Sequence, residues 1–294
     1  MLGVFPKYTG RKAWQARERM AHAFIEYFKN KGYEDSSELT LGRFHAQRDH
    51  GATIEDIARL EVSEGLGILS NTVPTCFWVL YDIYSRPDLL KELRDELRAN
   101  AITLGPDGTR TIDLVDIKEK CGLLISTFQE VLRVRSIGAP TRTVYKDILL
   151  NDQYLLKKGS LLMMPIKGIN REENTWGAQA HEFNPRRFAD GRQKDIKVTG
   201  FMSFGSSPWI CPGRHFATGE ILALVAMLVL RYDIDTETGG PWVPPKGNAA
   251  AIAASVAPPK EEMRVKATPT SEFEGTKWAF KITPGRGKFG LITG

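Results

Sequence analysis

Apolar positions recur with the spacing of amphipathic helices over the first part of the chain. Residues 11–30 carry this pattern and are followed by Gly32, a typical helix stop. A longer pattern runs from Thr53 to about Tyr84. Thr53 and Asp56 stand three residues apart at its start, which is the spacing of a capping box. The sequence therefore predicts helices over 11–30 and over about 53–84.

Two further helical patterns follow. One covers residues 117–135, with an apolar face formed by Leu123, Leu124, Thr127, Phe128, Val131 and Leu132. The other continues from a Cys-Pro-Gly sequence at 211–213 through the apolar run 221–230. We expect one helix over each pattern.

Strand signals lie in the second half of the chain. Residues 149–165 read as a hairpin with its turn near 157–159 and a return strand at 160–164. Residues 238–260 are rich in Gly, Pro and Ala and indicate loops, and the last strands are expected within 277–292. The fold class is thus mainly α with small β-sheets (α+β), with helices over 1–145, and with β elements and one long helix over 146–294.

One proline interrupts the long helical pattern of residues 53–84. Pro74 has no N–H group, so the carbonyl of Ser70 loses its helical partner. We expect a local kink or widened groove, with the polar residues Asn71 and Thr72 lying in it. A kinked helix buried only for packing is the alternative interpretation.

Composition narrows the function classes. The 294 residues are 42% hydrophobic and 26% charged, which is ordinary for a globular protein. The net charge is +5 and the basic residues are scattered, so we predict no nucleic-acid surface. Three cysteines give no disulfide framework. The longest apolar run, 221–230, is too short to span a bilayer, so no transmembrane segment is expected in this chain.

Cys211 stands where unusual chemistry is expected. A turn-forming stretch from Phe204 leads to it, and Pro212 after it suits a first helical position. Exposed amides and the helix dipole there favour a thiolate. Gly213 lacks a Cβ, so a flat group can come close to the backbone. Two alternatives stay open: a small buried cysteine, or a zinc ligand together with His215.

Glu130 and Arg133 form a second candidate group. They lie on one helix face at i,i+3 spacing. The spacing alone favours an ordinary surface ion pair.

Taken in order, these segments resemble the C-terminal part of the cytochrome P-450 family, and the chain would lack the N-terminal portion of that fold. The resemblance implies haem as the cofactor and Cys211 as the axial thiolate ligand. The segment Phe183-Asn184-Pro185-Arg186-Arg187-Phe188 resembles the Pro-x-Arg-Phe element of the family, which implies that Arg187 bridges Glu130 and Arg133. Two guanidinium groups around one carboxylate can form a buried network, because arginine pairs in a bidentate manner. The resemblance implies that this network holds the loop that presents Cys211. The haem contacts that it implies are Arg142, Phe204, Trp209, Gly213 and His215.

The helix with Pro74 resembles the distal, oxygen-binding helix of the family. The resemblance implies that Asn71 or Thr72 acts there, although most members carry an acid before the Thr. The sequence Asn-Thr-x-Pro is similar to that of the sterol- and bile-acid-hydroxylating and prostacyclin-synthase branches, and to that of many fungal enzymes of secondary metabolism. The resemblance therefore does not extend to the usual acid–alcohol proton relay, although Asn71 or Thr72 can hold a water or the distal oxygen by hydrogen bonding.

The resemblance implies a monooxygenase that oxidises an apolar small molecule, such as a sterol, terpenoid or polyketide, with O2 and electrons from an NADPH-dependent reductase. Two other functions stay open. One is a haem-thiolate isomerase or dehydratase that needs no reductase, and the other is a truncated, non-catalytic haem binder. Family members are usually anchored to the endoplasmic reticulum by an N-terminal helix, which we expect to be absent from this chain; otherwise a cytoplasmic location is expected.

Overall fold

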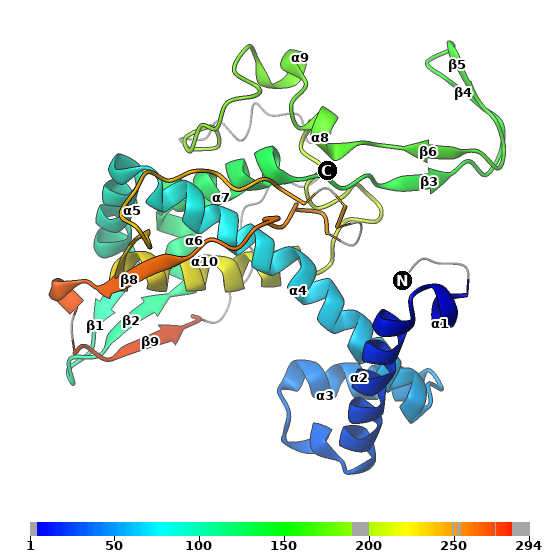
Figure 1. The fold of residues 1–294 in the computed structure, drawn as a ribbon, viewed down its shortest axis with the longest axis horizontal. Helices are drawn as coiled ribbons and strands as arrows, with labels where there is room; N and C mark the ends of the chain where they lie inside the picture. The colour runs from blue at the N-terminus through cyan, green and yellow to red at the C-terminus, as the bar shows by residue number, and fades with distance from the viewer. Residues whose placement is uncertain (1–4, 190–199, 249, 252–253, 274, 284–294) are drawn as a thin grey trace. The chain divides into compact units, whose positions relative to one another are not determined.

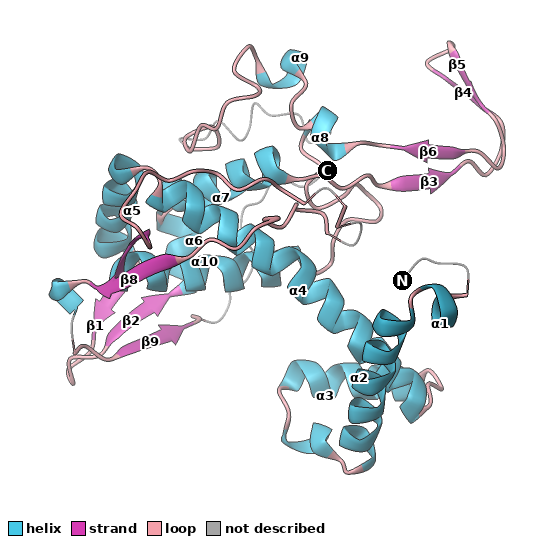
Figure 2. Ribbon diagram, viewed as in Figure 1, coloured by secondary structure: helices cyan, strands magenta, loops and turns pink. Residues whose placement is uncertain are grey.

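The computed structural model describes residues 5–189, 200–248, 250–251, 254–273 and 275–283. The chain forms two compact units, Met1–Leu69 and Ser70–Gly294. The boundary between them falls inside one helix, α4 (Ile54–Tyr84). Helices predominate and the strands are short and mostly paired in twos (Figure 2), so the predicted mainly α fold with small β-sheets is confirmed.

The first unit is helical. It contains α1 (Pro6–Thr9), α2 (Arg11–Lys29), the 3₁₀ turn η1 (Gly32–Asp35), α3 (Glu38–Asp49) and the start of α4. The predicted helix over 11–30 is confirmed by α2. A small apolar cluster holds the unit together and consists of Ile25, Phe28, Phe44, Ile57 and Ala58.

The start of α4 has the capping box that the sequence predicts. The Thr53 backbone N–H donates to Asp56 Oδ2, and the Asp56 N–H donates to Thr53 Oγ1, both at 3.1 Å. The Thr53 hydroxyl also donates to Asp56 Oδ2, at 2.7 Å, and this bond together with that of the Thr53 N–H lowers the pKa of Asp56 below its usual value. The helix then continues through Pro74 to Tyr84.

The second unit is built around packed helices. Its core is shared by the end of α4, α5 (Pro87–Asn100), α6 (Leu114–Lys120), α7 (Gly122–Arg135) and α10 (Arg214–Arg231). Helix α10 is continuously apolar over residues 221–230, and its buried face includes Ile221, Leu222, Val225, Ala226, Val229 and Leu230. Figure 1 shows α10 alongside α6 and α7, which it contacts. The short helices α8 (Ile166–Ile169) and α9 (Glu173–Trp176) precede α10.

The predicted single helix over 117–135 is wrong, because the structure has two helices that meet at Cys121. The backbone of Cys121 leaves the helical region, with ψ 66°. Past this break, the N–H groups of Leu123 and Leu124 donate to the two carboxylate oxygens of Glu96 on α5, at 2.8 and 3.0 Å. A side chain from another helix thus caps α7, which periodicity in 117–135 alone does not reveal.

Short sheets lie around the helices of the second unit. Strands β1 (Ile102–Leu104), β2 (Arg110–Asp113) and β9 (Trp278–Lys281) form one sheet, antiparallel between β1 and β2 and parallel between β2 and β9. Strand β7 (Tyr232–Thr236) pairs with β8 (Val265–Pro269). A further strand was expected up to residue 292, and residues 284–292 lie outside the described residues.

The hairpin predicted over 149–165 has a different turn. Strand β4 (Ile148–Leu150) pairs with β5 (Tyr154–Leu156), and the reversal falls at Asn151 and Asp152, both with positive φ. Asn and Asp tolerate this left-handed conformation better than most residues. The chain turns again at Gly159, and β6 (Leu161–Met163) then pairs with β3 (Thr141–Thr143) rather than with β4.

Candidate functional site

Cys211 lies at the end of a tight loop before α10. Its backbone N–H donates to the carbonyl of Phe204 at 2.8 Å, which closes the loop. Gly205 has φ +87°, and a Cβ at that position would lie 3.3 Å from the Trp209 carbonyl oxygen. Glycine is therefore the residue that fits this turn.

The helix after Cys211 starts later than the sequence predicts. Pro212 is not its first residue: α10 begins at Arg214, and Gly213 is its N-cap. The carbonyl of Cys211 accepts hydrogen bonds from the backbone N–H of Arg214 at 3.4 Å and from Arg214 Nη1 at 3.0 Å. Cys211 thus precedes the helix by a short turn, because residues 212–213 adopt turn geometry.

The thiol of Cys211 differs from the other two in this chain. Cys211 is exposed, whereas Cys76 and Cys121 are buried in the core of the second unit. Burial raises the pKa of Cys76 to about 11 and that of Cys121 to about 12. A Cβ added at Gly213 would meet only Cys211 Sγ within 4 Å, at 3.9 Å. The exposed thiol, next to a residue without a side chain, is therefore accessible to a metal ion that binds thiolates.

No zinc site accompanies Cys211 in the described part of the chain. No three His, Cys, Asp or Glu side chains gather there as a metal-ion cluster. His215 lies on the first turn of α10 and is half-buried. A structural zinc ion would need more ligands than Cys211 and His215 supply.

Glu130, Arg133 and Arg187 come together in the structure. Arg133 donates to both carboxylate oxygens of Glu130 at 2.8 Å, and Arg187 Nε lies 3.1 Å from each of them. The side chains of Glu130 and Arg133 are fully buried. The Asn184 N–H also donates to Glu130 Oε1, at 2.9 Å. This geometry is that of a buried network rather than a surface ion pair.

Asn170 connects this network to the cysteine loop. Arg133 Nη1 donates to the Asn170 carbonyl at 2.7 Å. The Asn170 side chain accepts from the Met202 N–H at 3.2 Å and donates to Ser203 Oγ at 3.0 Å. Met202 and Ser203 directly precede Phe204, whose carbonyl closes the Cys211 loop. The sequence analysis gave no role to Asn170, whose polar side chain is buried within this network.

The other candidate cofactor contacts have different surroundings. Arg142, on β3, is half-buried, and its Nη2 lies 3.5 Å from Ser206 Oγ in the cysteine loop. The Phe204 side chain packs against the core of the second unit. Trp209 is 73% exposed at the loop tip. The structure thus brings Arg142 to the Cys211 loop, while Trp209 faces solvent.

Asn71 and Thr72 lie on α4, one turn before Pro74, and both are half-buried. Thr75 Oγ1 donates to the Asn71 carbonyl at 2.7 Å, which adds a side-chain hydrogen bond to the helix ladder beside the proline. Asn71 Oδ1 accepts a hydrogen bond from the backbone N–H of Ser255 at 2.7 Å.

A second buried carboxylate was missed by the sequence analysis. Asp82 on α4 is 1% exposed and pairs with Arg86 at 2.8 Å and with Arg135 at 3.4 Å. The Arg135 guanidinium stacks 4.0 Å from the Trp78 ring centroid. The i,i+4 spacing of Asp82 and Arg86 is visible in the sequence. The link to Arg135, at the end of α7, depends on the tertiary fold.

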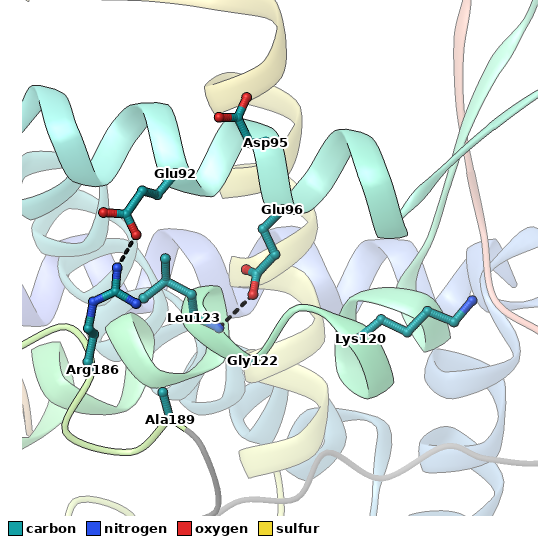
Figure 3. Close-up of a pocket in the computed structure, with 8 residues that line it drawn as sticks. All are labelled: Glu92, Asp95, Glu96, Lys120, Gly122, Leu123, Arg186 and Ala189. Carbon is teal, nitrogen blue, oxygen red and sulfur yellow. Dashed lines mark hydrogen bonds and ion pairs between the residues drawn. The ribbon is translucent and has the colours of Figure 1, made fainter.

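A polar pocket lies between α5 and the start of α7 (Figure 3). Its charged groups already have partners: Glu92 pairs with Arg186, and Glu96 caps α7. Lys120 pairs with Asp116 at 2.7 Å. Cys211 does not line this pocket, so it is separate from the candidate site.

Similarity to known proteins covers nearly the whole chain. A sequence profile of the family described as Cytochrome P450 matches residues 10–263. The chain is 44% identical over its full length to Cytochrome P450 monooxygenase nodJ of Hypoxylon pulicicidum. It is 30% identical over 94% of its length to a Cytochrome P450 monooxygenase of Gibberella zeae, and 30% identical over 57% of its length to Cytochrome P450 7B1 of Mus musculus. It spans 59%, 56% and 36% of the lengths of these proteins.

Proposed function

This chain belongs to the cytochrome P450 family, and from that premise we propose that it holds haem through Cys211 and acts as a monooxygenase. The observation that supports the ligand is the exposed Cys211 thiol next to Gly213, at the end of a hydrogen-bonded loop. Haem held by a cysteine thiolate would supply the chemistry of O–O bond cleavage. The family implies haem, and redox partners are general in the family.

The chain's own residues have distinct proposed tasks around this group. Cys211 Sγ would bind the iron, and the Arg142 guanidinium, which lies near the loop, would pair with a haem carboxylate. Phe204, Gly213 and His215 would line the haem, and Trp209 would contribute an N–H donor. Glu130, Arg133 and Arg187 hold the loop in place through Asn170.

On the α4 side, Asn71 and Thr72 are the proposed polar residues that face the substrate O2. Thr72 Oγ1 and Asn71 Nδ2 can donate hydrogen bonds that hold a water or the bound oxygen. Proton transfer from a water positioned in this way contributes roughly 10²–10⁴-fold to a rate. We further propose an apolar small-molecule substrate, of the sterol, terpenoid or polyketide type, and an NADPH-dependent reductase as the electron donor.

Labelled oxygen tests the proposed reaction. The haem-loaded chain is mixed with an NADPH-dependent P450 reductase and an apolar fungal extract under isotopically labelled O2. We expect products that carry one labelled oxygen atom, form only with NADPH, and are absent with Cys211→Ala. Unlabelled products that form without NADPH would instead support the isomerase or dehydratase, and failure to take up haem would contradict the proposal itself.

None of the helices in the described part of the chain combines the length and the hydrophobicity that a membrane crossing requires.

A further inference from the structure

Asn71 makes a contact that its position beside Thr72 does not suggest. Its Oδ1 accepts the Ser255 N–H at 2.7 Å, and the two residues are 184 positions apart in the chain. The Asn71 Nδ2 group donates to Ser70 Oγ at 3.4 Å. The side-chain oxygen of Asn71 is therefore already hydrogen-bonded to the backbone of a segment that is distant in the sequence.

The same segment has a second attachment to α4. Trp78 Nε1 donates to the Ala257 carbonyl at 2.7 Å. Asn71 and Trp78 are seven residues apart, so they lie on one face of the helix and are separated by ~10 Å at 1.5 Å per residue. Three extended residues cover a similar distance, ~10 Å at about 3.3 Å each. The segment Ser255–Ala257 thus matches the spacing of the two α4 side chains.

The same segment also pairs with the end of α7. The Ile137 N–H donates to the Ser255 carbonyl at 2.7 Å, and the Ala257 N–H donates to the Arg135 carbonyl at 3.4 Å. An isolated bridge joins Ser136 to Val256. The chain from Ile137 then leads into β3, where Arg142 meets the Cys211 loop. The segment Ser255–Ala257 therefore joins α4 to the chain that leads to Arg142.

We propose that Asn71 is a positioning residue. Its side chain holds the segment Ser255–Ala257 against α4 and so sets the separation between α4 and the chain that leads to Arg142. An uncharged amide suits this task, because it satisfies the Ser255 N–H without placing a carboxylate in a half-buried position. The part that concerns the reaction rests on the proposed function: Thr72, rather than Asn71, then serves the O2 side.

We call the hydrogen bond between Asn71 Oδ1 and the Ser255 N–H the clamp. Hydrogen exchange at the Ser255 amide tests this bond in protein that holds no cofactor. Asn71→Leu removes the acceptor oxygen at similar volume, so exchange at Ser255 should become roughly three- to tenfold faster, the effect of losing one hydrogen bond. The matched control Thr72→Val should leave Ser255 protection unchanged. Unchanged exchange in Asn71→Leu, or equal acceleration in Thr72→Val, would overturn the proposal.

A second pair of variants decides the question if Asn71→Leu does not fold. Asn71→Asp keeps an acceptor oxygen at the same reach, whereas the Asn71→Thr hydroxyl is one bond shorter. The clamp requires Ser255 to stay protected in Asn71→Asp and to exchange faster in Asn71→Thr. Equal exchange at Ser255 in these two proteins contradicts it.

Ligand binding in the haem-loaded chain separates positioning from simple stability. The clamp is proposed to set the separation between α4 and the chain that leads to Arg142. If it does, Asn71→Leu should weaken the binding of the bulky phenylimidazole by roughly threefold or more, the effect of losing one hydrogen bond. The Kd of the small ligand imidazole should not change. A parallel change in both values contradicts positioning. If neither ligand binds the parent chain, the haem proposal fails while the exchange result stands.

Discussion

At the scale of single residues, Asn170 joins the charged network to the cysteine loop. Its carbonyl accepts from Arg133, and its side chain bonds both Met202 and Ser203. Glu130 provides the only negative charge in contact with Arg133 and Arg187 among the ion pairs of the described residues. Without this carboxylate, two guanidinium groups would remain in or near the core, and that arrangement is unfavourable.

Replacing Glu130 should therefore destabilise the protein strongly. Glu130→Ala leaves Arg133 fully buried without a counter-charge, and we expect a loss of about 3–5 kcal/mol in the free energy of unfolding, together with loss of haem. Asp95→Ala is the control, because Asp95 is 57% exposed and pairs with Lys91 at the surface, where a pair contributes about 1 kcal/mol or less. Denaturant titration measures the free energy of unfolding of both variants. An equal loss in the two would show that Glu130 contributes no more to stability than a surface ion pair does, which contradicts the prediction.

At the scale of elements, helix α5 holds the ends of two other helices. Arg94 donates from Nε to the Val229 carbonyl at 2.9 Å and from Nη2 to the Tyr232 carbonyl at 2.8 Å, at the C-terminal end of α10. Glu96 accepts two N–H groups at the N-terminal end of α7. Each charge has the sign that favours the adjacent helix dipole. Helix α5 thus anchors both the helix after Cys211 and the helix that carries Glu130.

The Glu96 cap should leave a signature in the pH dependence of stability. Burial raises the pKa of Glu96, and the two backbone donors offset part of that shift. The folded protein then holds this proton to a higher pH than the unfolded chain does. The stabilisation from Glu96 is complete below its unfolded pKa and is lost as the pH rises through the folded pKa.

We therefore compare the parent with Glu96→Gln, which cannot ionise. The free energy of unfolding of the parent minus that of Glu96→Gln should fall between pH about 4, near the unfolded pKa of Glu, and pH about 7. Urea titrations at both pH values measure this difference. A difference that rises with pH would show that the hydrogen bonds to the carboxylate outweigh its burial.

At the scale of the whole molecule, the sequence patterns predicted those helices whose formation depends on residues close together in the chain. The helix over 11–30, the capped start of α4 and the apolar helix after Cys211 follow from periodicity and capping, and all three form. The break at Cys121 was missed because its cause, Glu96, lies on another helix. The reversal at Asn151 was missed because Lys157-Lys158-Gly159 gave a stronger turn signal, although both places turn.

In the candidate site too, local spacing predicted some residues, and contacts between distant parts of the chain were missed. The positions of Glu130 and Arg133 follow from helical spacing, and Arg187 was placed beside them by resemblance. Asn170, the Asp82–Arg135 pair and the Asn71–Ser255 hydrogen bond join residues far apart in the chain. No period or motif encodes such pairs, because they depend on how separate elements pack.

The most direct test of the central proposal is the carbon monoxide difference spectrum of the reduced, haem-loaded chain. With Cys211 as the ligand, the parent and the control Cys76→Ala should both show the Soret band of thiolate-ligated haem, because the Cys76 thiol is buried and its pKa is raised to about 11. Cys211→Ala should lack this band. A thiolate band that persists in Cys211→Ala, or that disappears in folded Cys76→Ala, would contradict the assignment of Cys211 as the ligand.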